Sequence, residues 1–245
     1  ELIGSRKNDH IRINLENDVS SSIMNGLEKY RFVHNALPEI DLRDIDLTQR
    51  IFNKNVSIPV LISSMTGGTP QAFQINQKLA VAAEHFGLAM GVGSQRAAIE
   101  DGSLVETFNI RRYAPTSLLF ANLGAVQLNY GYGVEECKRA VGMLDADALI
   151  LHLNPLQEAL QPEGETNFSG LLTKIEEICK DISVPVVVKE VGWGISAEIA
   201  QKLANSGVAA IDVAGAGGTS WSQVERFRLN EPNEILIAEA FLDWG

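Results

Sequence analysis

The sequence has few cysteines and no long apolar run, and these two absences narrow the class of protein. Its 245 residues contain only Cys137 and Cys179, with no CxxC motif and no Cys/His pair at a metal-binding spacing. We therefore expect reduced, buried thiols, as in a cytoplasmic protein, and no zinc site. No apolar segment approaches the roughly 20 residues of a membrane helix, and the first ten residues are polar rather than signal-like. We expect a soluble protein that does not associate with membranes.

Basic side chains are also scarce. The chain has 20 Lys and Arg against 31 Asp and Glu, so its formal net charge is −11. This balance argues against an extended basic surface, and we expect no nucleic-acid partner. A small anionic ligand needs only a local cluster of Arg, Lys and backbone N–H groups, which net charge does not report.

From Pro59 onward, short apolar runs rich in β-branched residues alternate with helix-like segments. The runs start about 25 to 36 residues apart, which is the length of a strand–helix unit with a parallel crossover. The segments between them carry apolar residues at helical spacing, with Ser196 as an expected N-cap and Gly207 as an expected terminator. Helices are expected over 134–144, 171–182 and 196–205, and strands over Val60–Ser63, Leu88–Gly93, Leu118–Leu123, Ala148–Leu153, Val184–Val188 and Ala209–Val213.

A closed α/β barrel fits this rhythm better than an open doubly wound sheet, because polar motifs follow every strand instead of gathering at one crevice. We predict a single-domain (β/α)8 TIM barrel. Residues 1–58 are expected to form an N-terminal extension packed over the barrel, and residues 59–245 the first six βα units. Eight strands close such a barrel, so we expect the last two βα units not to be represented in this chain. A fold other than the standard eight-stranded barrel is the alternative.

The first three expected strands end in motifs that suit a ligand. Ser63–Gly68 and Gly91–Arg96 combine glycines, which allow close backbone approach, with hydroxyl, amide and guanidinium groups. Asn122 ends the third strand, where an amide offers both a donor and an acceptor to a heteroaromatic ring. Taken singly, these motifs are also explained by ordinary turns, a surface salt bridge of Arg96 or a buried turn-forming asparagine.

The next two strands end in denser polar motifs. The fourth runs into His152 and Asn154, which alternation places on one side, and Gln157 and Glu158 are expected on the following loop. Packing alone does not explain an apolar strand that ends this way, and barrels carry their chemistry at the carboxyl ends of their strands. Lys189 follows the fifth strand, where it needs an anion, a flavin or a Schiff-base role to offset its burial.

Two further segments are polar. Residues 212–220 form a glycine-rich turn with hydroxyls that suit phosphate oxygens, although its glycines do not have GxGxxG spacing. Arg6–His10 concentrates positive charge, for which a solvated terminal face is the simplest interpretation from charge patterning alone.

Read together and in order, these motifs resemble the type 2 isopentenyl diphosphate isomerase family over nearly the whole chain. The matching strings are RKNDHIR, YRFVHNALPEID, SSMTGG, GVGSQRAA, ANLGAVQLNYGYG, LHLNPLQEALQPEG, VVVKEVGWGIS and DVAGAGGTSW. The resemblance implies an enzyme that interconverts isopentenyl and dimethylallyl diphosphates without net redox change. It implies FMN and Mg²⁺ as cofactors, NADPH as the reductant of the flavin, and a homo-oligomer, either a tetramer or an octamer.

The resemblance also implies roles for particular residues. Flavin contacts are implied for Ser64, Met65, Thr66, Ser94, Asn122, Lys189 and Thr219. Substrate contacts, mostly to the diphosphate, are implied for Arg6, Lys7, Ser94, Gln95, Arg96, His152, Asn154 and Gln157. Glu158 is implied as the metal-site carboxylate, and catalytic roles are implied for His152, Gln157 and Lys189.

Moving a double bond requires one proton to be delivered and another removed, and no side chain in these motifs is an evident strong acid. We therefore expect reduced FMN to do most of the acid–base work while the protein orients the substrate. The family's last two units also carry a Gly-Gly-Ile-Arg-type loop around the FMN phosphate. This sequence lacks that loop, so we expect an incomplete phosphate pocket and weak FMN binding by this chain.

Two alternatives stay open. An FMN-dependent 2-hydroxy-acid oxidase or dehydrogenase shares the barrel and the cofactor, but it uses a His and Arg pair on late strands that this sequence does not contain. A non-catalytic flavin-binding protein is the other alternative, and the intact motifs at the expected catalytic face argue against it.

Overall fold

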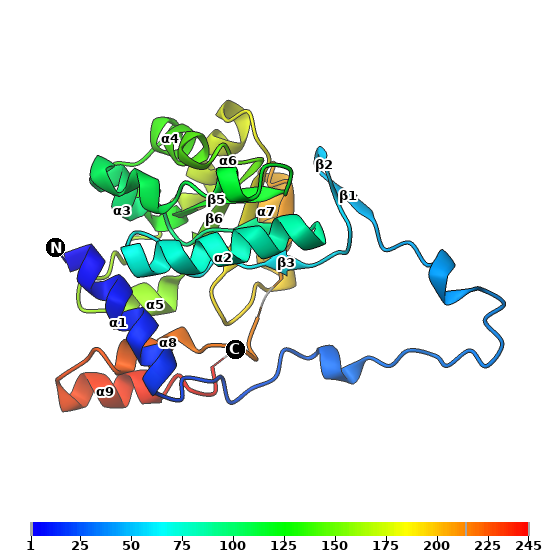
Figure 1. Ribbon diagram of the computed structural model, residues 1–245. Coiled ribbons are helices and arrows are strands. Elements are labelled where there is room, and N and C mark those ends of the chain that lie inside the picture. Colours follow the sequence, from blue (N-terminus) through cyan, green and yellow to red (C-terminus); the bar gives the residue numbers. More distant parts are fainter. Residues whose placement is uncertain (1, 214, 245) are drawn as a thin grey trace.

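The computed structural model describes residues 2–213 and 215–244, and its centre is a six-stranded parallel sheet. The strands follow one another in sequence order, each paired in parallel with the next, and helices connect them (Figure 1). Each strand overlaps the run predicted for it, and the arrangement confirms a TIM-barrel-like α/β fold. The strands are β3 (Leu61–Ile62), β4 (Ala89–Gly91), β5 (Leu119–Gly124), β6 (Ala148–Leu153), β7 (Val186–Glu190) and β8 (Ala210–Asp212).

The helices begin and end where local chemistry favours it. Thr69 Oγ1 accepts a hydrogen bond from the amide of Ala72 at the start of α2, and Gly87 ends that helix with φ of 62°. Ser196 Oγ accepts from the amide of Ile199, which confirms the predicted N-cap. The α-helices are α1 (Leu2–Glu16), α2 (Pro70–Phe86), α3 (Arg96–Glu100), α4 (Val134–Leu144), α5 (Pro155–Leu160), α6 (Leu171–Asp181), α7 (Ala197–Asn205), α8 (Trp221–Arg226) and α9 (Pro232–Glu239). Short 3-10 segments are η1 (Leu27–Lys29), η2 (Leu42–Asp44), η3 (Gly102–Thr107), η4 (Arg111–Tyr113) and η5 (Ala125–Asn129).

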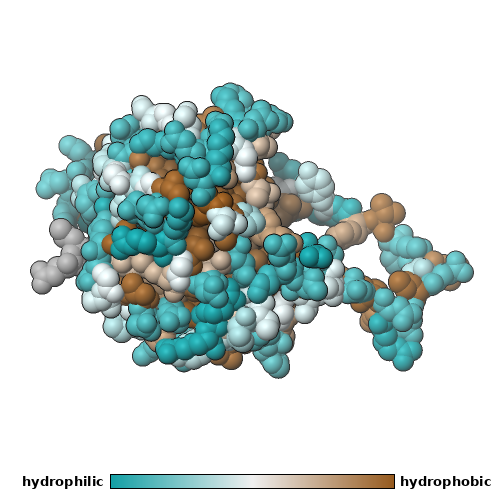
Figure 2. Space-filling view, turned by 90° about the horizontal axis from the view of Figure 1, so that it is seen from above, coloured by the Kyte–Doolittle hydropathy of each residue, from teal (hydrophilic) through white to brown (hydrophobic). Residues whose placement is uncertain are grey.

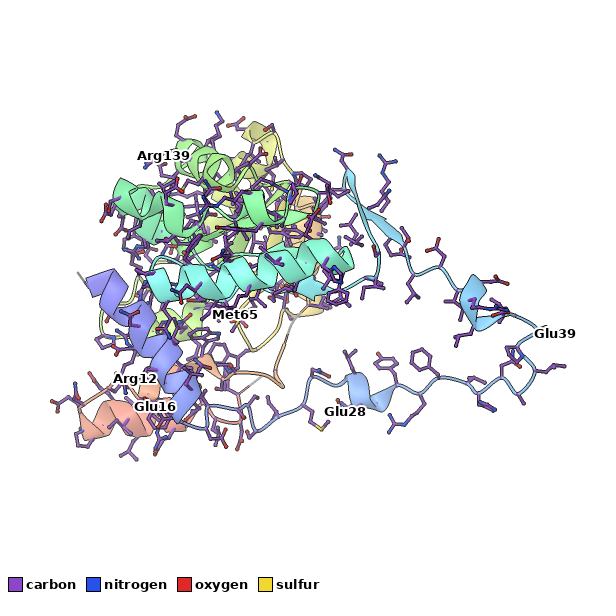
Figure 3. All side chains as sticks on the ribbon, in the orientation of Figure 1. Arg12, Glu16, Glu28, Glu39, Met65 and Arg139 are labelled. Carbon is purple, nitrogen blue, oxygen red and sulfur yellow. The ribbon has the colours of Figure 1, made fainter. Side chains whose placement is uncertain are left out.

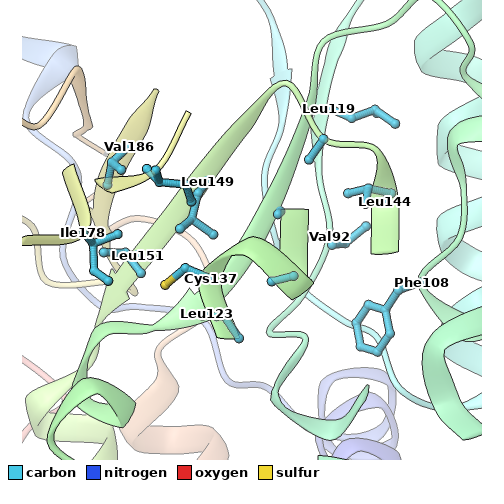
Figure 4. Packing of buried hydrophobic residues seen from close by; sticks show 14 of the residues in the cluster. Val92, Phe108, Leu119, Leu123, Cys137, Leu144, Leu149, Leu151, Ile178 and Val186 are labelled. Atoms are coloured by element: carbon cyan, nitrogen blue, oxygen red, sulfur yellow. The ribbon is translucent and has the colours of Figure 1, made fainter. Parts of the chain in front are cut away.

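Alternate residues of the central strands face opposite sides of the sheet. On the outer side, Leu119, Leu123, Leu149 and Leu151 pack against the helices in the main hydrophobic cluster (Figure 4). Cys137 of α4 belongs to the same cluster, which agrees with the buried thiol predicted there. Burying each such side chain contributes roughly 1.5–3 kcal/mol to folding, so this layer fixes the sheet against its helices.

The inner side of the sheet has its own apolar cluster near the amino ends of the strands. Phe120, Ile150 and Val187 pack there against Val56 of β2 (Lys54–Val56). β2 pairs antiparallel with β1 (Gln49–Ile51), so this hairpin covers the amino end of the inner face. Apolar side chains therefore fill the inner face near the amino ends of the strands, and other side chains occupy it near the carboxyl ends.

The N-terminal extension contains a helix that the sequence pattern did not reveal. α1 spans 15 residues and packs on α8, where Ile13 and Val19 form a small cluster with Val224. Its weak apolar periodicity has a structural reason, because Arg6, Lys7 and His10 turn inward to a polar cavity rather than to a core. Over the described range, no helix combines the length and the apolar character needed to cross a membrane.

The next segment, residues 22–48, is here called the arm, and it does not pack over the barrel as predicted for the extension. It leaves the body after α1, loops outward and returns at β1 and β2 (Figure 1). Glu39 lies at its far end and Glu28 nearer the body (Figure 3), and apolar residues alternate with polar ones on its surface (Figure 2). Phe32 and Val33 are 105% and 96% exposed, so the arm has no core of its own.

Candidate active site at the carboxyl ends of the strands

Three polar side chains end neighbouring strands on the inner face. Asn122 of β5, His152 of β6 and Lys189 of β7 continue the alternation that places Phe120, Ile150 and Val187 below them. His152 pairs in register with Lys189, so the two side chains lie side by side on adjacent strands. Because parallel strands present their carboxyl ends at one edge, the three groups meet where α/β barrels carry their chemistry.

These side chains line a cavity of 320 Å³, which strand ends, α1, α5 and the turn before α8 enclose. Ala214 of the glycine-rich turn lies outside the described residues. All but two of the side chains predicted for the site line this cavity: Arg6, Lys7, Ser64, Met65, Ser94, Arg96, Asn122, His152, Asn154, Gln157, Glu158, Lys189 and Thr219.

Thr66 and Gln95 do not line the described cavity. Gln95 is fully buried, its Nε2 donates to the carbonyl of Ala140 at 2.8 Å, and its Oε1 accepts from the amide of Asn122 at 2.9 Å. Both ends of the amide are therefore used inside the protein, which removes Gln95 from direct contact with a substrate in this conformation. The backbone carbonyl of Thr66 is used within the fold, where it accepts from the amide of Gly93 at 2.8 Å and from Asn76 Nδ2 at 2.9 Å.

His152 is held as a neutral imidazole. Its Nδ1 lies 2.9 Å from Asn122 Oδ1, and Asn122 Nδ2 donates to the carbonyl of Val92 at 3.0 Å, which fixes the orientation of the amide. Nδ1 therefore carries the proton and Nε2 is left as an acceptor. Burial, and after it the positive charge of Lys189, lowers the pKa of His152 to about 3. At neutral pH this side chain can orient a ligand but cannot act as a cationic acid.

Lys189 is a buried amine with only 6% of its surface exposed. Its Nζ donates to the carbonyl of Glu190 at 2.9 Å. Burial lowers the pKa of Lys189, and the carboxylates of Asp212 and Glu190 oppose that effect. The Glu190 carboxylate is itself held by the amides of Gly192 and Trp193 at 2.6 Å each. The site thus keeps a buried amine beside the buried carboxylate of Glu190 and the partly buried carboxylate of Asp212, and a negatively charged ligand would further favour the protonated amine.

Glu158 is buried and lies in α5, whereas a loop was predicted for it and for Gln157. Its Oε1 accepts from Asn154 Nδ2 at 2.8 Å, and its Oε2 accepts from Gln161 Nε2 and from the amide of Glu165. Asn154 precedes the helix, so strand β6 and helix α5 together position the carboxylate. A buried carboxylate with this many donors is held in one orientation, which is what a metal ligand requires.

A second buried carboxylate, Glu225 of α8, was not predicted from the sequence. Its Oε1 accepts from Gln157 Nε2 at 2.9 Å and lies 3.1 Å from His10 Nε2. Burial would raise the pKa of Glu225, but the hydrogen bonds from His10 and Gln157 and the charge of Arg228 bring it down to about 2. His10 and Glu225 come from opposite ends of the chain, and no local motif indicates that they meet. The only signal in the sequence was His10 within the basic Arg6–His10 segment.

Positive charge enters the cavity from α1 and α3. Arg6 and Lys7 come from α1, and Arg96 begins α3. Burial, and after it the neighbouring charge of Arg6, lowers the pKa of Lys7 to about 8, so the amine is mostly protonated at neutral pH. Three cations around one cavity in a protein of net charge −11 form the local cluster that a small anion needs.

Two buried oxygens indicate that the cavity is built for ligands. Ser64 Oγ and Asn154 Oδ1 are buried without a hydrogen-bond partner among the described residues, and both residues line the cavity. Unpartnered buried oxygens are costly, so a bound group that pairs with them is favoured. Within residues 2–213 and 215–244, no group of three or more His, Cys, Asp and Glu side chains is arranged so that it could hold a metal ion. Mg²⁺ needs only one or two carboxylates besides water and phosphate, so Glu158 beside Asn154 Oδ1 fits Mg²⁺.

The fold and the cavity define an α/β enzyme of the barrel type, with its site at the carboxyl ends of parallel strands. No protein-family model matches the chain. It is 58% identical over 242 residues to an isopentenyl-diphosphate delta-isomerase of Nostoc sp., a match that covers 98% of this chain and 69% of the relative. The isopentenyl-diphosphate delta-isomerase of Synechocystis sp. is 56% identical, and the match covers 98% of this chain and 69% of the relative. The isopentenyl-diphosphate delta-isomerase of Oceanobacillus iheyensis is 52% identical, and the match covers 99% of this chain and 70% of the relative. The chain therefore belongs to the isopentenyl-diphosphate delta-isomerase family and is an enzyme of that kind.

Solved structures with a similar fold are more distant in sequence. A variant of an active chimera of (S)-mandelate dehydrogenase aligns with a TM-score of 0.58 and 15% identity, over 91% of this chain and 72% of that protein. A mandelate oxidase variant with an FMN adduct aligns with a TM-score of 0.53 and 15% identity, over 99% of this chain and 76% of that protein. At this identity the likeness concerns the fold, and a fold shared with an FMN enzyme is consistent with the type 2 family predicted from the motifs.

Proposed function

We propose that this enzyme interconverts isopentenyl and dimethylallyl diphosphates with reduced FMN and Mg²⁺ bound in the cavity at the strand ends. One observation carries the proposal. The cations Arg6, Lys7 and Arg96 and the carboxylate Glu158 line the same cavity as Asn122 and Lys189. The three cations would bind a diphosphate and Glu158 its metal ion. Asn122 and Lys189 would contact an electron-rich ring.

FMN fits the side of the cavity that β3, β5 and β7 form. Ser64 Oγ is a buried hydroxyl with no partner, and the nearby Lys189 amine suits a ring that carries negative charge when reduced. Reduced FMN would supply ring nitrogens that can give and take a proton beside the alkene. Ser64, Met65, Ser94, Asn122, Lys189 and Thr219, which all line the cavity, are the residues proposed to hold it. A flavin-bound structure with the ring far from Asn122 and Lys189 would overturn this assignment.

The protein's own residues bind and orient the substrate. Arg6, Lys7 and Arg96 are proposed to hold the diphosphate, and Glu158 to hold Mg²⁺, which neutralises charge and fixes the direction of the substrate. His152 is neutral, so it accepts a hydrogen bond through Nε2 rather than delivering a proton. The Gln157 amide donates a hydrogen bond to Glu225, which anchors it, and we propose that this amide orients the reacting end of the substrate.

The remaining parts of the proposal rest on the resemblance of the motifs. They are NADPH as the reductant, a cytoplasmic location and a homo-oligomer that is a tetramer or an octamer. Loss of flavin absorbance on anaerobic addition of NADPH tests the reductant, and analytical ultracentrifugation tests the assembly. A monomer at micromolar concentration would remove the assembly from the proposal.

The reaction itself can be tested directly. FMN-loaded protein, reduced with NADPH and supplied with Mg²⁺, should convert isopentenyl diphosphate to dimethylallyl diphosphate without consuming NADPH in proportion to product. Oxidation of a 2-hydroxy acid such as mandelate, with no isomerisation, would favour the oxidase alternative. Flavin binding without either reaction would favour a non-catalytic protein.

A further inference from the structure

The loop that follows α5, residues 161–170, is seated tightly against the cavity. A Cβ atom added at Gly164 would lie 1.7 Å from the backbone oxygen of Glu158, so no other residue fits there without moving the backbone. On the same loop, Glu163 pairs with Arg228 at 2.7 Å. These contacts hold the intervening backbone beside Glu158.

Glu165 on this loop makes all three of its polar contacts with residues that line the cavity. Its Oε1 lies 2.8 Å from Arg96 Nη2, and its Oε2 accepts from Gln127 Nε2 at 2.9 Å. Its backbone amide donates to Glu158 Oε2 at 2.7 Å. The two charged side chains are 16% and 21% exposed, so solvent only partly screens their interaction.

Arg96 has a second carboxylate partner on its outer side. Its Nε lies 2.7 Å from Glu100 Oε1, one turn further along α3, and the Glu100 side chain is 41% exposed. Glu165 is the more buried of the two, and it alone also contacts Gln127 and Glu158. An incoming anion that binds Arg96 from the cavity therefore competes with Glu165 more than with Glu100.

We propose that Glu165 is a positioning residue of the diphosphate site, an internal counter-anion that holds the Arg96 guanidinium at the cavity until a diphosphate takes its place. The inference rests on the proposed function, because it needs Arg96 to bind the diphosphate. In this arrangement the Glu165 carboxylate sets the affinity of the site, since each anion that binds must displace it from Arg96. The backbone amide of Glu165 donates to Glu158, so displacement of the Glu165 carboxylate from Arg96 is also coupled to Glu158.

The variant Glu165→Gln tests this role because it keeps the size of the side chain and one acceptor oxygen but removes the competing charge. We expect inorganic pyrophosphate, titrated calorimetrically into the FMN-loaded protein without added metal, to bind roughly three- to fivefold more tightly than to the wild type. Glu163→Gln is the matched control: it makes the same charge change on the same loop without contact to Arg96, and its Kd should stay within roughly twofold of the wild type.

A double-mutant cycle separates this role from a general effect of charge. Arg96→Gln should weaken pyrophosphate binding, and adding Glu165→Gln to that variant should then change the Kd by less than roughly twofold. Unchanged or weaker binding by Glu165→Gln, or the same tightening without Arg96, overturns the role of Glu165 and leaves the diphosphate site in place. Wild-type pyrophosphate binding by Arg96→Gln removes Arg96 from the proposed diphosphate site and overturns the inference built on it.

Discussion

Gln157 of α5 donates a hydrogen bond of 2.9 Å from Nε2 to Oε1 of Glu225 on α8, which joins a residue predicted for the site to one that was not. Glu225 is fully buried, and its other oxygen, Oε2, pairs with Arg228 Nη1 at 2.6 Å. An ionised carboxylate is stable in such a place only with several donors. The orientation of the Gln157 amide therefore depends on a helix that lies 68 residues further along the chain.

The Glu225 carboxylate should make folding stability depend on acid pH. Its pKa falls from an ordinary 4.5 to about 2 in the folded state, so its stabilising effect is present above pH 4.5 and is lost as the pH falls towards 2. This shift corresponds to about 3 kcal/mol, as an order of magnitude. In Glu225→Gln, the free energy of unfolding measured with urea should be lower at pH 7 and should vary less between pH 5 and 2.5. Glu231→Gln, at an exposed position, should follow the wild type, and equal pH dependence in all three proteins would contradict the prediction.

Lys7 should make anion binding sensitive to alkaline pH. Its pKa is lowered to about 8, so the amine loses its charge as the pH rises from 7 to 9. A bound diphosphate favours the charged amine, and the Kd of pyrophosphate should therefore rise by roughly three- to tenfold over this range. Arginine stays protonated throughout, so Lys7→Arg should flatten the profile. Parallel profiles for the two proteins, measured by calorimetry, would remove Lys7 from the anion site.

Glu158 should determine the response to Mg²⁺. Glu158→Gln keeps the shape and part of the hydrogen bonding with Asn154 but removes the charge that a hard cation prefers. Isomerase turnover should fall by about 10- to 100-fold, and half-saturation should require more Mg²⁺. FMN affinity, measured by fluorescence quenching, should change by less than roughly twofold because the metal is proposed at the diphosphate. Wild-type turnover with an unaltered Mg²⁺ titration would exclude Glu158 from the metal site.

Lys189 should affect the reduced flavin more than the oxidised one. Lys189→Ala removes a buried amine from the cavity and leaves Asp212 and Glu190 nearby, so a negatively charged reduced ring would lose its cation. The midpoint potential of bound FMN should become more negative, and turnover should fall by about tenfold or more. Spectroelectrochemical titration measures the potential. An unchanged potential together with wild-type turnover would show that Lys189 does not face the flavin.

The fold was largely predictable because it follows from local periodicity. Alternation within each apolar run assigned Phe120, Ile150 and Val187 to one face, and the same alternation carried Asn122 and His152 to the carboxyl ends of that face. Polar groups at those positions are not needed for packing, so they stood out against apolar neighbours. The helix of 134–144 was likewise visible from its apolar spacing.

Contacts between distant segments were decided only by the tertiary structure. The sequence by itself determined which side chains point inward from each strand, because the two-residue repeat of a strand is a local property. It did not determine that His10 contacts Glu225, that the Gln95 amide forms hydrogen bonds with Asn122 and Ala140, or that the arm extends from the body. Those outcomes depend on how α1, α4 and α8 pack, and packing joins residues whose separation along the chain leaves no periodic signal.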